Sequence, residues 1–157
     1  DMCAFTASEP QDLITCFLYS IHYSGGIERL KACIASVHAA LEVDGLFCFN
    51  GVDKGKIDNR LFAAHSVEND DGQFTFSSGW SYPGEGEQQA LRLRIEKTTA
   101  GQTEVWDDEH PMVAVSFAEL QALLQPYFAV QVFEHDYEKL IPWDGVSGNA
   151  LFACVKI

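Results

Sequence analysis

Basic residues are scarce in this sequence. It contains 10 Lys and Arg against 23 Asp and Glu, which gives a formal net charge of −13. An acidic surface repels phosphate backbones, so we do not expect the protein to bind nucleic acid unaided. Lys54, Lys56 and Arg60 form the best candidate for a local basic patch, and a solvated loop explains them better.

Closely spaced metal or disulfide ligands are also lacking. The five cysteines are an odd number, and no two of them lie at metal-ligand spacing. Four of them, Cys16, Cys33, Cys48 and Cys154, lie in apolar runs. This pattern indicates buried free thiols in a reduced, cytoplasmic protein without a metal site. A hydrolase with Cys16 or Cys48 as its nucleophile is an alternative that the pattern disfavours.

Long hydrophobic runs are absent, so we predict neither a membrane span nor a signal peptide. The 157 residues are 47% apolar and 21% charged, as in one ordinary globular domain. No glycine-rich loop of the form G-x-G-x-x-G occurs anywhere in the sequence. The first residue is Asp rather than Met, so we expect an N-terminus that is cut, processed or incomplete.

An α/β pattern opens the chain. Residues 13–18 and 46–49 are apolar without alternation, as in strands that are buried on both faces. Residues 27–42 repeat apolar side chains every three or four positions, as in a helix with one apolar face, and Asp44 and Gly45 follow as its end. Strand, helix and strand in this order predict a right-handed βαβ unit with parallel strands.

The middle of the chain changes to alternating patterns separated by turn residues. These predict antiparallel strands over residues 73–80, 90–97, 104–106 and 112–116. Afterwards a capping box at Ser116 and Glu119 opens a second helix, and two further strands are predicted over residues 128–133 and 150–157. We therefore expect one α/β core, residues 1–50 and 113–157, with an antiparallel insertion over residues 51–112.

The linear order of these elements resembles the C-terminal part of a class I S-adenosylmethionine-dependent methyltransferase. The family's fourth strand and following loop are similar to DLITCFLYSIHY, and its next helix and fifth strand to ERLKACIASVHAALEVDGLFCFN. Its last helix and sixth strand are similar to EHPMVAVSFAELQALLQPYFAVQVFEHD, and its seventh strand to NALFACVKI. The resemblance implies a partial Rossmann-like sheet with strands in the order 4-5-7-6, the seventh strand antiparallel, and an antiparallel β insertion between strands 5 and 6.

The same resemblance implies S-adenosylmethionine as the cofactor, bound over the carboxyl ends of the strands. Asp1 and Met2 occupy the place of the family residues that embrace the adenine. Phe17 closes the fourth strand, where the family meets the amino-acid end of the cofactor, and Tyr23 stands at the far end of the following loop.

On the substrate side, the resemblance implies Tyr19, Ser20 and His22, with Trp80 and Tyr82 in a lid formed by the insertion. Capping of a helix start is the alternative role for the first three residues. Methyl transfer needs positioning and desolvation more than acid–base groups, so no catalytic triad is expected. His22, His110 and Tyr19 are the base candidates, and packing is the alternative for each; Phe74 and Phe76 are expected in the core of the inserted sheet.

The first three strands of the family, with its glycine-rich loop, have no counterpart in this sequence. We therefore expect a truncated methyltransferase for small-molecule acceptors that binds the cofactor poorly or not at all by itself. The strand from Leu13 to Leu18 should be covered at its free edge by the missing N-terminal half or by a second copy, as in a homo-oligomer. The alternative is a non-catalytic, methyltransferase-like dimerisation or binding module.

Overall fold

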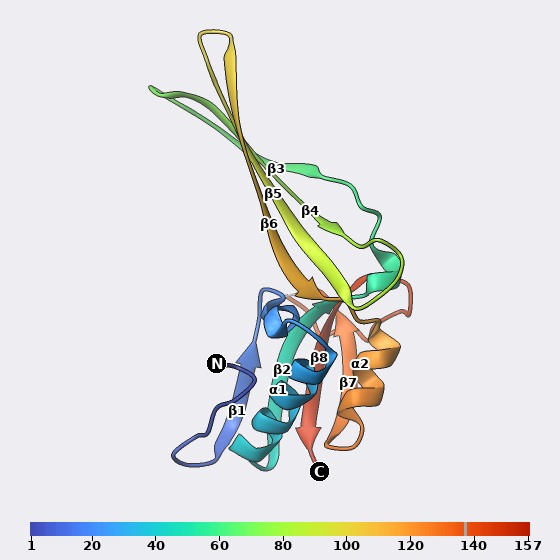
Figure 1. The fold of residues 1–157 in the computed structure, drawn as a ribbon. Helices are drawn as coiled ribbons and strands as arrows, with labels where there is room; N and C mark the ends of the chain where they lie inside the picture. Colours follow the sequence, from blue (N-terminus) through green and yellow to red (C-terminus); the bar gives the residue numbers. More distant parts are fainter. Residues whose placement is uncertain (137) are drawn as a thin grey trace.

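Two four-stranded sheets meet end to end in the computed structural model, which describes residues 1–136 and 138–157. The first has the strand order β1-β2-β8-β7 and carries both α-helices, and the second has the order β3-β4-β5-β6. Figure 1 shows the second sheet rising as a long ribbon from one end of the first. Neither helix within the described residues has the length and hydropathy that a membrane-spanning segment requires.

The first sheet has the predicted topology. Strand β1 (Gln11–Cys16) lies parallel to β2 (Leu41–Val52), and the helix α1 (Ile27–Ala40) connects them. Strand β8 (Asn149–Lys156) lies antiparallel between β2 and β7 (Phe128–Glu134). This order confirms the expected 4-5-7-6 arrangement with an antiparallel seventh strand.

Helix α1 ends two residues earlier than predicted, and β2 begins earlier. Leu41 already has extended backbone angles, and β2 continues through Asp44 and Gly45, which were expected to end the helix. Asp44 lies in the left-handed region at φ 63°, and a Cβ on Gly45 would stand 2.9 Å from the carbonyl oxygen of Glu42. The two residues therefore form an irregularity inside a strand instead of a turn before it.

The hydrophobic core lies between one face of the first sheet and the two helices. Phe49 and Phe152 stack on neighbouring strands with ring centroids 4.8 Å apart. Phe117, the first residue of α2 (Phe117–Leu124), meets Phe152 edge to face at 5.3 Å. Ser116 caps this helix through the predicted capping box with Glu119. Because α1 and α2 pack on the same face, the helices hold one side of the sheet only (Figure 1).

The prediction that the first strand is buried on both faces is wrong. Leu13 is 55% exposed and Leu18, just beyond the strand, is 77% exposed. Within the described residues β1 pairs with β2 alone, so it forms an edge of the sheet. Its inner side chains, Ile14 and Cys16, pack toward α1, whereas the opposite face has no covering layer in the described chain.

The inserted sheet consists of four antiparallel strands between β2 and α2. They are β3 (Phe62–Asn69), β4 (Gly72–Ser81), β5 (Gln88–Thr99) and β6 (Gln102–Val113). The sequence did not predict β3, and β6 is one continuous strand where two short ones were expected. Phe76, predicted in a sheet core, is 37% exposed because no second layer covers this sheet in the described chain.

Candidate functional site

The loop after β1 has a strained backbone. Leu18 and Tyr19 both lie in the left-handed region, at φ 54° and 59°, which side chains with a Cβ adopt at a cost of about 1 kcal/mol or more each. The side chain of Asn50, at the end of the neighbouring strand β2, accepts a hydrogen bond from the Tyr19 N–H at 3.2 Å. Such strain is concentrated at functional sites, so it marks this loop as the first part of the candidate site.

Tyr19 brings three parts of the chain together. Its ring meets Trp80 of β4 edge to face with centroids 5.1 Å apart, and it meets His135, just after β7, at 5.8 Å. Tyr19 and Trp80, both predicted on the substrate side, are therefore neighbours. Ser20 begins a short 3₁₀ helix, η1 (Ser20–Ser24), which carries the chain from this loop toward α1.

His22 of η1 is completely buried, so it does not line an open cleft as predicted. Its Nε2 accepts a hydrogen bond from the Val52 N–H at 3.0 Å, and its Nδ1 contacts the Val113 carbonyl oxygen at 3.0 Å. These partners require a neutral ring with its proton on Nδ1. Burial lowers the pKa of His22 to about 4, although the bond to Val113 acts in the opposite direction. The ring joins the last residue of β2 to the last residue of β6.

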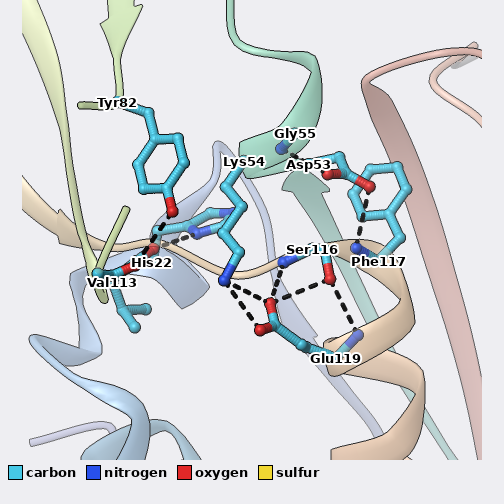
Figure 2. A network of polar contacts seen from close by, with 10 residues as sticks. His22, Asp53, Lys54, Gly55, Tyr82, Val113, Ser116, Phe117 and Glu119 are labelled. Carbon is cyan, nitrogen blue, oxygen red and sulfur yellow. Dashed lines mark hydrogen bonds and ion pairs between the residues drawn. The ribbon is translucent and has the colours of Figure 1, made fainter. Parts of the chain in front are cut away.

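A polar network also holds the junction between the insertion and the core (Figure 2). The carboxylate of Asp53 accepts hydrogen bonds from the N–H groups of Gly55 at 2.8 Å and Phe117 at 3.1 Å. The Lys54 ammonium lies 2.8 Å from the carboxylate of Glu119, in the first turn of α2. The insertion is therefore fixed to the core both where it leaves and where it returns.

A cavity of about 300 Å³ opens between the inserted sheet and the ends of β2 and β8. Trp80 and Phe62 supply aromatic walls, and Lys56, Asp58 and Asn149 supply polar ones. The Oδ1 atom of Asn149 is buried and lacks a hydrogen-bond partner among the described residues. A cavity of this size, with both aromatic and polar walls, suits a small polar molecule.

Tyr82 does not line this cavity, although the sequence placed it on the substrate side. It follows β4, and its hydroxyl donates a hydrogen bond to the Gly86 carbonyl oxygen at 3.2 Å. Its N–H donates to the side-chain oxygen of Asn59 at 2.6 Å. These contacts hold it to the turn between β4 and β5 and to the segment before β3.

Two of the residues predicted to face the cofactor, Asp1 and Met2, lie near the other end of η1. Arg29 of α1 binds both carboxylate oxygens of Asp1, at 3.0 and 3.1 Å, and its Nε donates to the carbonyl oxygen of Ser24 at 2.9 Å. Met2 lines an apolar hollow beside β1 and α1. Phe17 directly follows β1 and is partly exposed. Arg29 thus ties the start of the chain to the end of η1.

Tyr23 ends this row of residues and connects it to the insertion. Its hydroxyl lies 2.6 Å from Nδ1 of His110 on β6, and Nε2 of His110 lies 3.2 Å from the carboxylate of Asp108. Partial burial and the negative charge of Asp108 raise the pKa of Tyr23. Tyr23 and His110 were each predicted as site candidates, but their contact was not predicted.

Asn50 and Asn149 are among the polar residues of the site that were not predicted. Both are polar residues at one end of an apolar strand, beside the insertion: Asn50 follows the apolar run of β2, and Asn149 opens β8. That placement is a signal which the sequence contained, because strand ends are where α/β proteins place ligand contacts.

Metal and thiol chemistry find no support in the described residues. No group of three or more His, Cys, Asp or Glu residues there is arranged to hold a metal ion. All five cysteines are free thiols. Burial raises the pKa of Cys16 and Cys48, the two proposed nucleophiles, so both remain protonated at neutral pH.

Solved structures share this arrangement at low sequence identity. CalS10, an amino pentose methyltransferase from Micromonospora echinaspora solved with S-adenosylmethionine, aligns at 16% identity with a TM-score of 0.78, over 100% of this chain and 63% of its own. DesVI from Streptomyces venezuelae aligns at 20% identity with a TM-score of 0.75, over 100% and 63%. An S-adenosylmethionine-dependent methyltransferase from Clostridium acetobutylicum aligns at 18% identity with a TM-score of 0.71, over 100% and 62%.

No protein-family model matches the sequence, and no curated protein sequence does. The chain spans about three fifths of the length of the solved methyltransferases that it resembles. Over that length it has the fold of the class I S-adenosylmethionine-dependent methyltransferases.

Proposed function

We propose that this chain is the substrate-facing part of an S-adenosylmethionine-dependent methyltransferase with a small-molecule acceptor. The observation that carries the proposal is the βαβ unit of β1, α1 and β2, whose strand ends carry a strained loop, Asn50 and the cavity at Trp80. This is the edge of an α/β sheet at which ligands bind. The likeness to CalS10 and DesVI supports the reaction class.

In this proposal Asp1, Met2, Phe17 and Tyr23 face the cofactor, and Tyr19 faces the acceptor with Ser20 and Trp80. Tyr82, held to the turn after β4, lies outside the acceptor cavity. The cavity of about 300 Å³ and the net charge of −13 favour a small acceptor over a nucleic acid. Two of the similar solved structures are described as an amino pentose methyltransferase and a sugar N-methyltransferase, which supports an amino sugar as the acceptor.

We infer in addition that another polypeptide segment, or a second copy of the chain, covers the free edge of β1. Leu13 and Leu18 are apolar and largely exposed there, and such an edge invites strand pairing. A separate segment, unlike a second copy, would also complete the cofactor site, because this sequence itself holds no G-x-G-x-x-G loop.

Isothermal titration with S-adenosylmethionine and with S-adenosylhomocysteine tests the proposal. The full translation product of the gene should bind both at micromolar concentration, whereas residues 1–157 alone should give little or no heat. Absence of binding by the full product would refute the proposed function.

A non-catalytic dimerisation or binding module is the second candidate, and the inserted sheet favours it. Trp106, Ile95 and Phe76 are neighbours across β6, β5 and β4, and between 37% and 49% of each is exposed. Exposed apolar faces of this kind mark interaction surfaces. Sedimentation showing a dimer, together with no cofactor binding by the full product, would support this candidate.

A further inference from the structure

A chain of three polar side chains links η1 to the inserted sheet. The Tyr23 hydroxyl lies 2.6 Å from Nδ1 of His110, and Nε2 of His110 lies 3.2 Å from Oδ2 of Asp108. A carboxylate only accepts hydrogen bonds, so the His110 proton stands on Nε2 and points at Asp108. Nδ1 then has a free lone pair, and the Tyr23 hydroxyl donates to it. The phenol oxygen keeps its own lone pairs for a further donor.

We propose that Tyr23, His110 and Asp108 form a proton relay that deprotonates the methyl acceptor, with Tyr23 as the group that touches it. The relay rests on the proposed function. Methyl transfer needs a base only when the acceptor atom still carries a proton. An amine that is protonated at neutral pH, or a hydroxyl group, is such an acceptor.

The position of Tyr23 fits this role. It is 43% exposed, so a ligand can reach its hydroxyl. The residue that follows it, Ser24, is tied through Arg29 to Asp1, at the place proposed for the cofactor. The hydroxyl itself meets His110 of the inserted sheet. Tyr23 therefore stands between the proposed cofactor side and the insertion, and the relay places the acceptor atom there, outside the residues that line the cavity at Trp80.

The surroundings of His110 suit a side chain that holds one proton. Across the sheet His110 faces Leu91, and Asp108 faces Leu93, so their neighbours on β5 are apolar. Asp108 is the charged group that acts on the Tyr23 phenol. Partial burial, and then the charge of Asp108, raise the pKa of Tyr23, which keeps the phenol protonated at neutral pH. Tyr23 can then pass a proton on, while His110 is the group that stores it.

One proton passes from the acceptor to His110 by way of Tyr23. The acceptor N–H or O–H bond breaks as its proton moves to the phenol oxygen of Tyr23, and the phenol proton moves to Nδ1 of His110. The product is an imidazolium paired with the carboxylate of Asp108. The lone pair left on the acceptor forms the new bond to the methyl carbon, while the carbon–sulfur bond of the methyl donor breaks. The imidazolium later releases its proton to water.

Nitrogen NMR of the histidine side chains tests the resting state of the relay without turnover. In the wild-type protein His110 should carry its proton on Nε2, and D108N should weaken this preference because the charged acceptor of the Nε2 proton is lost. A His110 ring with its proton on Nδ1 would overturn the relay, because Tyr23 could then no longer donate to it.

Methyl transfer to glucosamine, measured with the full translation product, tests its use. Y23F and H110Q should each lower kcat by about 100-fold, the lower end of the range for acid–base groups. D108N should also lower kcat, because the carboxylate that stabilises the imidazolium is lost. Y127F and H65Q are matched controls, since Tyr127 packs on His38 and Phe128 and His65 lies farther out on β3.

The outcomes separate the relay from the function on which it rests. Unchanged rates and pH profiles in both Y23F and H110Q, with normal cofactor binding, would overturn the relay alone. Failure of the full product to bind S-adenosylmethionine would overturn the proposed function and the relay with it.

Discussion

Protonation of His22 should weaken the fold below pH 6.5, because this ring joins the two ends of the insertion. In the folded chain its Nε2 accepts the Val52 N–H, so a proton on Nε2 would remove that bond and set two donors face to face. Burial lowers the His22 pKa to about 4, whereas an exposed histidine titrates near 6.5. Between these values the unfolded chain binds more protons than the folded one, so stability rises with pH.

The size of the effect follows from the two pKa values. The stabilisation is fully present above about pH 6.5 and is lost as the pH falls toward 4, by about 3 kcal/mol in all. About 2 kcal/mol of this should already be lost at pH 5. For a domain whose total stability is about 5–15 kcal/mol, such a loss is readily measured.

Urea unfolding at pH 7.5, 6.5, 5.5 and 5.0, followed by tryptophan fluorescence, provides the assay. H22Q and H22N should be less stable than wild type at pH 7.5, by about 1–3 kcal/mol each, because one backbone partner loses its bond. This difference should shrink by about 2 kcal/mol at pH 5, since neither variant titrates. H65Q, at an exposed position, should follow the wild-type slope. Wild type and both His22 variants running parallel from pH 7.5 to 5.0 would refute the reasoning.

Three substitutions and one labelling experiment test other parts of the structure. F152A should destabilise the chain by about 3–5 kcal/mol in urea unfolding, since it empties the centre of the core; a loss below 1 kcal/mol would contradict that placement. S116A should cost about 1 kcal/mol through loss of the cap on α2, and an unchanged midpoint would speak against it. D53A should cost about 1–3 kcal/mol, because it leaves two N–H groups without their acceptor. Cys33 and Cys154, whose pKa burial raises to about 12, should resist iodoacetamide at pH 7.5 until urea is added, as mass spectrometry can show; labelling of either in the native chain would argue against burial.

The order of the elements could be predicted from the sequence because their patterns are strong and local. The apolar stripe of α1 and the two apolar runs beside it predict that β1 and β2 are parallel. The capping box of Ser116 and Glu119 predicts the start of α2. Strand β3 was missed because its apolar residues are few and weakly alternating. The exposure of Leu13 was missed because composition cannot tell which face of a strand a helix will cover.

The contacts of the candidate site are harder to predict, because they join distant parts of the chain. Two partners of His22 are backbone groups 30 and 91 residues away, which leave no trace in residue identity, and a third is the side chain of Gln89, 67 residues away. The contact of Tyr23 with His110 spans 87 residues and depends on the register of β6 against β5. The left-handed backbone of Leu18 and Tyr19 is likewise not a local preference of these residue types, and the hydrogen bond from the Tyr19 N–H to Asn50 spans 31 residues.

The insertion leaves the core after Val52 and returns to it at Val113, and the imidazole ring of His22 contacts both residues. A segment whose two ends are anchored side by side in this way projects from the sheet without forming part of it. Its length can change at the distal hairpins without moving β2 against β8, and the entropy of closing a longer loop grows only slowly with its length. The reach of this ribbon can therefore change while the underlying sheet stays the same.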